Sequence, residues 1–338
     1  MTRPLDDLLA SLGRAPILPE PADHPEFSVI VRTQGDRPDS LREALGGLAA
    51  QTIAPLETLV MVHRSDGAGG AAGEAGEIAE RVERELAETT EALPAGWRTI
   101  AVEGGTRSRP LNAGLGAASG DYVTFLDDDD LVMPNWIEAF ASGAVQAPGA
   151  IVRAVCLTQP WTTDGGSQPV RPTGDVERPF ADRFDLLAHL SHNDTPICSI
   201  ALPRPTLDLL GLRFDEELAV FEDWELLVRT AMITGVVSVS EPTSLYRRLD
   251  GGNAFAAVEE STWHRTHAQV IDRFRSRPVL LPAGVADRLA AAHFDPDGST
   301  EHERRAAALE SSPWWRLTAA PRRAVTALRQ GRNRLRRR

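Results

Sequence analysis

Residues 122–136 have the sequence YVTFLDDDDLVMPNW, in which a run of apolar and β-prone residues ends abruptly in four adjacent aspartates. The carboxylates of Asp127–Asp130 repel one another, and no basic residue close by in the sequence neutralises them. In an open sheet of parallel strands, ligands bind outside the carboxyl ends of the strands. We therefore expect the four aspartates to follow a buried strand and to lie at the binding edge of a sheet.

The segments before this stretch alternate between the patterns of buried strands and of helices. The strands are predicted at 27–33, 57–63, 99–103 and 121–126, and the helices at 38–51, before Thr90, and at 110–119. Ser40 and Glu43 have the spacing of a capping box, which marks the start of the first helix. Strands that are apolar on both faces and alternate with helices indicate a parallel sheet covered by helices.

The second half of the chain is less regular, and the same patterns predict a mixture of strands and helices there. The strands are predicted at 150–157, 197–202, 236–240 and 244–248. The helices are predicted at 183–191, 204–210, 222–234 and 258–275. Residues 158–180 are rich in Pro, Gly, Asp and Thr, which is typical of a long surface loop.

The length and composition of the chain are those of a globular protein. Its 338 residues are 42% hydrophobic and 25% charged, which is enough to bury a substantial core. No stretch reaches the roughly 20 apolar residues that cross a bilayer, and the acidic, proline-broken N-terminus does not resemble a signal peptide. We therefore expect a cytoplasmic protein in which Cys156 and Cys198 are reduced core residues rather than a disulfide or a zinc site.

The net charge of −12 is distributed unevenly along the chain. Nine arginines and no acids lie from Ser311 onward, and removing these nine charges leaves −21 for residues 1–310. The tail also holds Trp314 and Trp315, and a basic helix with aromatic anchors suits the surface of an anionic membrane. A solvated tail and a partner-binding helix remain alternatives, whereas the acidic body argues against nucleic-acid binding.

Clusters of oxygen ligands such as Asp127–Asp130 suit the hard cations Mg²⁺, Mn²⁺ and Ca²⁺. A calcium loop spaces its ligands at alternate positions around a central glycine and ends in a glutamate, and this stretch lacks that pattern. The remaining alternatives are a divalent ion shared with the phosphates of a nucleotide and a solvated acidic turn that caps the following helix. The position after a predicted strand favours the divalent ion.

A second acidic pair, Glu222 and Asp223, occurs in the stretch FDEELAVFEDWELLVR, residues 214–229. The pair opens a predicted helix, where carboxylates commonly serve only as partners of the helix dipole. A carboxylate at this position is also suited to act as a general base, because the helix end and nearby ions would keep it ionised at neutral pH.

The sequence resembles the family 2 glycosyltransferases of the GT-A fold in four stretches: FSVIVRTQGDRPDSLREALGGLAAQT, ETLVMV, RSRPLNAGLGAASGDYVTFLDDDDLVMPNW and FDEELAVFEDWELLVR. The resemblance runs from about Phe27 to Asn253. It implies an α/β GT-A fold with a mostly parallel central sheet flanked by helices and a helical C-terminal extension. The implied domains are a proline-rich leader at 1–25, the GT-A domain at 26–255, a helical extension at 256–310 and a basic amphipathic tail at 311–338.

The resemblance also implies roles for particular residues. Asp127 and Asp129 would bind a divalent cation, Mg²⁺ or Mn²⁺, and with Asp128 the nucleotide-sugar. Asp223 would be the catalytic base, with Glu222 beside it. The other implied donor contacts are Thr33 at the nucleotide base, Arg109 and Asn112 at the ribose and phosphates, Asp66 after the second strand, and Arg247 with Arg248 over the phosphates. His192 and Asn193 lie where acceptor contacts are common.

Two stretches depart from the family pattern. The second strand ends in VMVHRSD, so that His63 and Arg64 stand where aspartates usually contact the nucleotide, and Asp66 comes two residues late. The usual Pro-Thr-Tyr-Asn after the first strand is replaced by RTQG. We therefore expect the nucleotide base to be recognised differently and do not assume uridine. His63 is either a nucleotide contact or a loop residue.

The function implied is that of an inverting, metal-dependent glycosyltransferase. It would move a sugar from a nucleotide-diphospho-sugar to a hydroxyl of a glycan or lipid-linked acceptor in the synthesis of cell-surface polysaccharide, with the tail at the inner face of the plasma membrane. One alternative is a glycosyltransferase-like binding or scaffold protein that has lost catalysis, which the altered VMVHRSD suggests. The other is a nucleotidyltransferase, although RTQGDRPDS holds only one glycine where that class has a glycine-rich phosphate loop.

Overall fold

The computed structural model describes residues 3–65, 73–89, 92–164, 168–249 and 260–281, together with positions 285 and 289. The chain divides into two units, Met1–Leu281 and Pro282–Arg338. All the helices and strands named below belong to the first unit. The predicted extension beyond residue 281 and the basic tail lie almost entirely outside the described residues.

The first half of the chain forms a parallel sheet, as predicted. Its strands are β1 (Phe27–Thr33), β2 (Glu57–Arg64), β3 (Trp97–Glu103) and β4 (Tyr122–Asp127), in the spatial order β3-β2-β1-β4. The helices between them are α2 (Pro38–Ala49), α3 (Glu74–Ala87) and α4 (Ser108–Ala117). The parallel register of β1 and β4 sets Arg32 opposite Asp127 at the carboxyl ends of both strands.

The second half of the chain extends this sheet with mixed pairing. Beyond β4 the order continues β8 (Ile200–Pro203), β6 (Ile151–Thr163), β9 (Val236–Leu249) and β5 (Leu131–Val132), and β7 (Pro169–Pro172) pairs with β6. β8 is antiparallel to β4, whereas β9 is parallel to β6. The remaining helices are α1 (Pro4–Ser11), α5 (Trp136–Gln146), α6 (Leu186–His189), η1 (Ile197–Ser199), α7 (Arg204–Leu210), α8 (Glu222–Thr234) and α9 (Glu260–Arg275).

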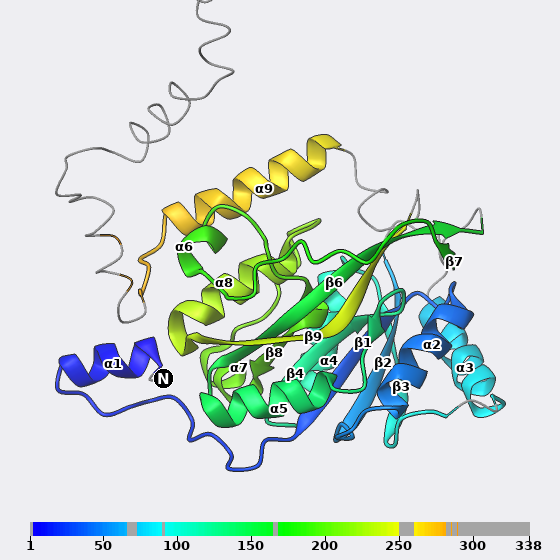
Figure 1. The fold of residues 1–338 in the computed structure, drawn as a ribbon, viewed down its shortest axis with the longest axis horizontal. Helices are drawn as coiled ribbons and strands as arrows, with labels where there is room; N and C mark the ends of the chain where they lie inside the picture. Colours follow the sequence, from blue (N-terminus) through cyan, green and yellow to red (C-terminus); the bar gives the residue numbers. More distant parts are fainter. Residues whose placement is uncertain are drawn as a thin grey trace, which may run out of the picture. The chain divides into compact units, whose positions relative to one another are not determined.

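Helices cover both faces of the central sheet (Figure 1). Val29 and Val31 of β1 belong to a buried cluster with side chains of α2, α3 and α5. Ile30 points to the opposite face and belongs to a second cluster with side chains of α4, α8 and α9. This alternation explains why the strands are apolar on both faces. Cys156 and Cys198 are free and buried, as predicted.

Two local predictions were wrong. The segment 158–180 is not a continuous loop, because β6 runs on to Thr163 beside β9 and then pairs with β7. Backbone pairing with a distant strand here overrides a composition typical of loops. The capping box is also absent: α2 begins at Pro38, with Arg37 at its N-cap and no side-chain cap, and Glu43 instead forms an ion pair with Arg247.

None of the helices within the described ranges combines the length and the apolar character that crossing a bilayer demands.

Gly114 and Gly116, both in α4, offer a matched pair of substitutions. A Cβ on Gly114 would lie 2.7–2.9 Å from side-chain atoms of Ile30, whereas one on Gly116 would meet nothing within 4 Å. We expect Gly114→Ala to lower the free energy of unfolding by about 1–3 kcal/mol through overpacking. Gly116→Ala should raise it by up to about 1 kcal/mol through helix propensity. Urea denaturation measures both, and equal effects would contradict the close packing of α4 on β1.

Candidate active site

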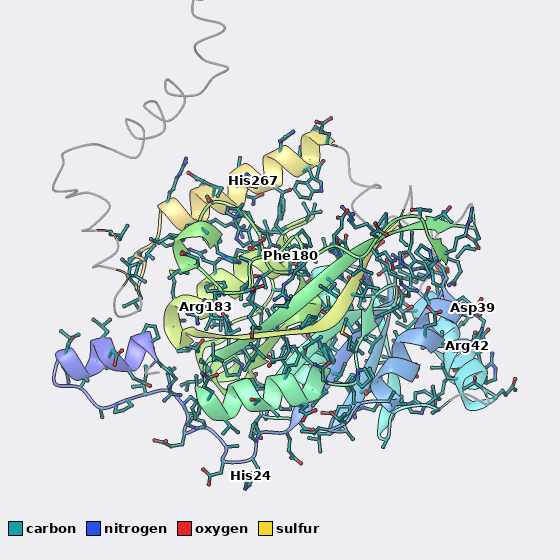
Figure 2. The ribbon with its side chains drawn as sticks, viewed as in Figure 1. His24, Asp39, Arg42, Phe180, Arg183 and His267 are labelled. Atoms are coloured by element: carbon teal, nitrogen blue, oxygen red, sulfur yellow. The ribbon has the colours of Figure 1, made fainter. Side chains whose placement is uncertain are left out.

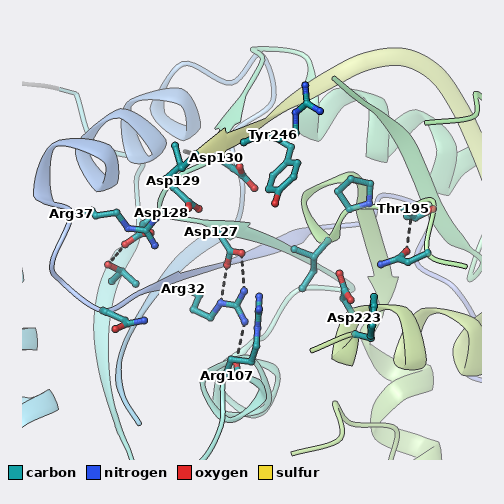
Figure 3. Close-up of a pocket in the computed structure, with 18 of the residues that line it drawn as sticks. Arg32, Arg37, Arg107, Asp127, Asp128, Asp129, Asp130, Thr195, Asp223 and Tyr246 are labelled. Carbon is teal, nitrogen blue, oxygen red and sulfur yellow. Dashed lines mark hydrogen bonds and ion pairs between the residues drawn. The ribbon is translucent and has the colours of Figure 1, made fainter. Parts of the chain in front are cut away.

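A cavity of about 690 Å³ opens at the carboxyl ends of β1 and β4. This volume falls within the range typical of small-molecule sites. The lining residues come from segments far apart in the sequence: Arg32, Thr33, Gln34, Arg37, His63, Arg107, Asp127–Asp130, Phe180, His192, Asn193, Thr195–Ile197, Phe221, Asp223, Tyr246, Arg248, Leu249, Trp263 and His267. Figure 3 shows Asp127 and Asp223 at this cavity on different elements.

The four aspartates form a tight loop after β4, called here the Asp loop (Asp127–Asp130). Two arginines from the region of β1 neutralise part of its charge. Arg32 donates to both carboxylate oxygens of Asp127, at 2.8 and 2.7 Å. Arg37 pairs with Asp128 at 2.8 Å and also with Asp129. The missing counter-charges are therefore supplied by residues more than 90 positions earlier in the chain.

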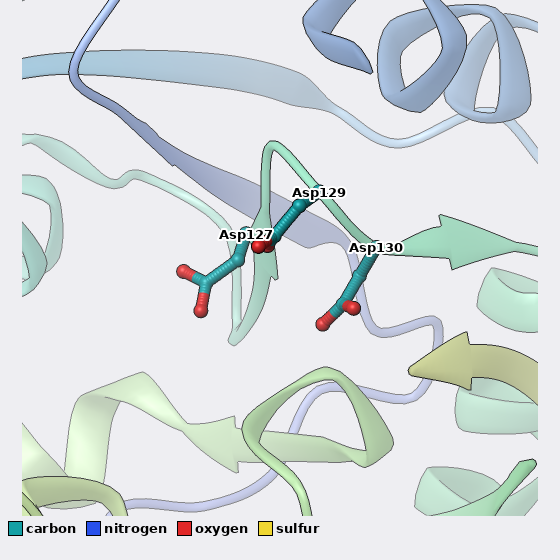
Figure 4. A group of neighbouring side chains, drawn as sticks. All are labelled: Asp127, Asp129 and Asp130. Atoms are coloured by element: carbon teal, nitrogen blue, oxygen red, sulfur yellow. The ribbon is translucent and has the colours of Figure 1, made fainter. Parts of the chain in front are cut away.

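Three members of the Asp loop could share one cation. Asp127, Asp129 and Asp130 each offer an oxygen, and these oxygens lie within 4.8 Å of one another (Figure 4). Carboxylate oxygens are the ligands that Mg²⁺ and Mn²⁺ prefer. Only two guanidiniums pair with these four carboxyl groups, and a divalent ion would add the positive charge that favours their ionised forms. The residues present therefore fit such an ion.

Burial and the neighbouring charges shift the pKa values of three aspartates of the Asp loop. Burial, and then repulsion by neighbouring aspartates, raise the pKa of Asp130 well above its usual range. Burial also raises the pKa of Asp128 to about 7, against the opposing effect of Arg37 and of the hydroxyl of Thr33, which donates to it at 2.5 Å. For Asp127 the effect of burial is outweighed by Arg32, so its pKa is lowered.

Glu222 and Asp223 open α8, as predicted, but their side chains differ in environment. Glu222 does not line the cavity; it is 2% exposed and lies 2.7 Å from Arg107 and 3.3 Å from Arg32. Asp223 lines the cavity. Burial, and then repulsion by Glu222, raise the pKa of Asp223 to about 7. Burial thus opposes the ionised form that the helix end and nearby ions were expected to favour at Asp223.

The structure brings together many of the residues singled out in the sequence. Six of those given donor, metal or base roles line the cavity: Thr33, Asp127, Asp128, Asp129, Asp223 and Arg248. His63, His192 and Asn193 line it as well. Asp66 lies outside the described residues.

Arg109, Asn112 and Arg247 are not among the lining residues. The amide of Asn112 donates to the carbonyl of Phe214 at 2.9 Å and accepts from its N–H at 2.9 Å, so it fixes the segment before α8. Arg107, rather than Arg109, lines the cavity.

Arg247 contacts the Asp loop without lining the cavity. Its side chain is buried, donates to the backbone carbonyl of Asp129, and lies 2.6 Å from a carboxylate oxygen of Glu43. Its backbone N–H donates to Asp130 at 3.1 Å, and its guanidinium lies over the ring of Trp161 at 5.1 Å. These contacts hold the loop in place.

Sequence patterns missed several lining residues. Arg32, Arg37 and Arg107 are basic residues near the carboxyl ends of strands, and an arginine that ends an otherwise apolar strand requires an acidic partner. That signal was present in VIVRT. Phe221, Trp263 and His267 carried no signal, because an aromatic residue in a helical pattern is more often part of the core.

The comparisons with known proteins agree with this geometry. Residues 80–201, which include the Asp loop but end before Asp223, match the sequence model described as Glycosyl transferase family 2. The succinoglycan biosynthesis protein ExoO of Rhizobium meliloti (strain 1021) is 30% identical over 172 residues, 46% of this chain and 48% of ExoO. The chain thus spans about half the length of this curated relative.

The fold is shared with a solved structure. The crystal structure of residues 1–349 of S. aureus TarS, in complex with UDP-GlcNAc, superposes with a TM-score of 0.51 at 19% identity. The likeness covers 80% of this chain and 73% of the TarS chain. It confirms the predicted α/β GT-A architecture, with a central sheet flanked by helices. The matched segment and the ExoO relative thus make residues 80–201 similar to glycosyl transferase family 2, within a chain that has the GT-A fold.

Proposed function

We propose that the chain is a glycosyltransferase of polysaccharide synthesis that moves a sugar, with inversion, from a nucleotide-diphospho-sugar to a hydroxyl of a glycan. The observation that carries the proposal is one cavity with two acidic centres, the Asp loop and Asp223, contributed by different elements. Inversion needs one centre to stabilise the leaving group and another to accept a proton. Both are available on the lining of a cavity of suitable size.

The Asp loop is the proposed donor end. Asp127, Asp129 and Asp130 would hold a divalent cation there, and when bound the cation would neutralise charge that develops on the diphosphate. Arg32, Arg37 and Arg107 line the cavity with the Asp loop and could orient phosphate oxygens through charge-assisted hydrogen bonds.

Asp223 is the proposed base. A carboxylate oxygen of Asp223 takes the proton of the acceptor hydroxyl as that oxygen bonds to the anomeric carbon. The bond between this carbon and the diphosphate oxygen breaks, and its electron pair leaves with the diphosphate. A pKa of about 7 suits this role, because a general base works best when its pKa is near the operating pH.

The relatives support the substrate class. ExoO is described by its part in succinoglycan biosynthesis, and the TarS fragment was solved with UDP-GlcNAc. We extend a nucleotide-sugar donor and a glycan acceptor to this chain on that basis. The donor base is left open, because His63 faces the cavity while Arg64 pairs with Asp36 at 2.8 Å. A lipid-linked acceptor and membrane contact through residues 311–338 stay predictions from sequence.

Thermal melting against UDP, GDP, dTDP and CDP, with and without Mn²⁺, tests the donor site. We expect one nucleotide to stabilise the protein in a metal-dependent way, by about 2.7 kcal/mol at a hundredfold excess over Kd. Asp129→Ala should abolish the shift because it removes an oxygen ligand. Asp39→Ala, an exposed residue of α2 outside the cavity lining, should retain it.

The alternative outcome is equally informative. If no nucleotide shifts the melting temperature of the wild type, the donor site is contradicted. A glycosyltransferase-like scaffold that has lost catalysis would then be the better account.

A further inference from the structure

Part of the cavity lining is aromatic rather than charged. Trp263 and His267 lie one turn apart on α9, and both line the cavity together with Phe221. The ring of Phe221 stands edge-on to Trp263, with 4.2 Å between centroids, and lies 5.7 Å from His267. These three residues are called here the aromatic wall.

α9 is anchored so that it presents this wall. Val270 and Phe274, farther along the helix, are buried, and Phe274 packs edge-on against Trp224 of α8 at 5.5 Å. Arg273 forms an ion pair with Asp215. Trp263 and His267, nearer the start of α9, are only half-buried and face the cavity (His267 is labelled in Figure 2). The distal half of α9 therefore fixes the position of these two rings.

The backbone at Phe221 supports a functional role for the wall. Among the described residues, Phe221 is the only one other than glycine with a positive φ, at 68°. Such a conformation costs a non-glycine residue on the order of 1–2 kcal/mol and is often found at ligand sites. It places the Phe221 ring against α9 just two residues before Asp223 in the sequence. Phe221 and the proposed base thus lie on one turn, at the start of α8.

The charges around the cavity limit what the wall can bind. Each arginine that lines the described cavity is ion-paired with a carboxylate: Arg32 with Asp127, Arg37 with Asp128 and Asp129, Arg107 with Glu222, and Arg248 with Glu177. These arginines are therefore charge-compensated, and the Asp loop and Asp223 on the same lining would repel an anionic sugar. A neutral sugar needs only an apolar ring face and hydrogen-bonding groups, which Asn193 and His192 can supply.

We propose that the aromatic wall is the acceptor platform and that the acceptor is a neutral pyranose at the end of a glycan. The sugar ring stacks on the wall and directs one hydroxyl to Asp223. This inference rests on the proposed function and adds the acceptor class to it. Trp263 and His267 are binding residues, and Phe221 both binds the sugar and positions Asp223.

Transfer to methyl and octyl pyranosides of glucose, galactose, mannose and N-acetylglucosamine, and to the matching glucuronides, tests the platform. Released nucleotide is measured with the donor identified by melting. We expect neutral pyranosides to be preferred and Trp263→Ala to raise their KM at least tenfold. Trp263→Phe should recover part of this loss, and His267→Ala should raise KM as well. His264→Ala, on the exposed side of the same helix, should change nothing.

The outcomes separate the two proposals. A retained nucleotide shift in Trp263→Ala shows that the variant is folded and that its donor site is intact, and an unchanged acceptor KM would then overturn the platform. A preference for glucuronides, or an effect of Trp263 confined to octyl compounds, would also overturn it, the latter in favour of an alkyl contact. Absence of any nucleotide shift in the wild type would instead contradict the proposed function.

Discussion

Asp223→Asn is expected to lower the rate of sugar transfer by about 10²–10⁴-fold, the usual contribution of a positioned general base. The substitution preserves shape and removes the group that accepts the proton of the acceptor hydroxyl. Initial rates at saturating donor measure the loss. Asp208→Asn, at a surface ion pair with Arg204, controls for the loss of a carboxylate elsewhere, and its rate should be that of the wild type. Near-wild-type transfer by Asp223→Asn would contradict the assignment.

The dependence of the transfer rate on pH tests the same assignment of Asp223. Burial, and then Glu222, raise the pKa of Asp223 to about 7, and only the deprotonated carboxylate can accept a proton. We therefore expect kcat/KM of the wild type to rise with pH up to about 7 and to level off above it. This rising limb should be absent from the residual activity of Asp223→Asn. A limb of unchanged position in the variant would assign it to another group.

Arg32→Met is expected to lower the free energy of unfolding by about 3–5 kcal/mol, the usual effect of removing one partner from a buried ion pair. Arg32 links Asp127 to Glu222: it donates to both oxygens of Asp127 and lies 3.3 Å from Glu222. Methionine keeps most of the side-chain volume but removes the positive charge beside the carboxylates of Asp127 and Glu222. Urea denaturation at neutral pH measures the loss.

Two further variants make the Arg32 result specific. Arg42→Met removes an exposed pair with Asp39 on α2 and should lower stability by less than about 1 kcal/mol. Adding Asp127→Asn to Arg32→Met should recover part of the loss, because the amide needs no counter-charge. A loss below 1 kcal/mol for Arg32→Met would show that water or movement already screens these carboxylates.

The parallel half of the fold was predictable because its signal is local. Each strand from β1 to β4 is a short apolar run, and each intervening helix has its own periodicity, so the Asp loop could be assigned to a strand end. The same reasoning failed at β6 and β7. β6 pairs along its length with β9, 85–88 residues away, and no local pattern encodes that register.

The sequence pointed to the acidic residues of the candidate site but not to the arginines that pair with them. A cluster of aspartates is visible in sequence, whereas the pairing of Arg32 with Asp127 follows from the register of β1 and β4. The raised pKa of Asp223 was not visible in the sequence for a related reason. Burial sets it, and burial is a property of the assembled chain rather than of the helix turn that carries the residue.

The stretch from Asn112 to Tyr122 carries much of the family resemblance. Its residues do not line the cavity and instead hold elements of the fold together. Asn112 ties α4 to the segment before α8, Gly114 lets α4 approach β1, and a Cβ on Gly120 would lie 2.7 Å from the backbone N–H of Ser28. A descendant that lost its carboxylates would still need these three residues to fold. They therefore report on the fold, whereas the pairing of Arg32 and Arg37 with the Asp loop reports on the proposed donor site.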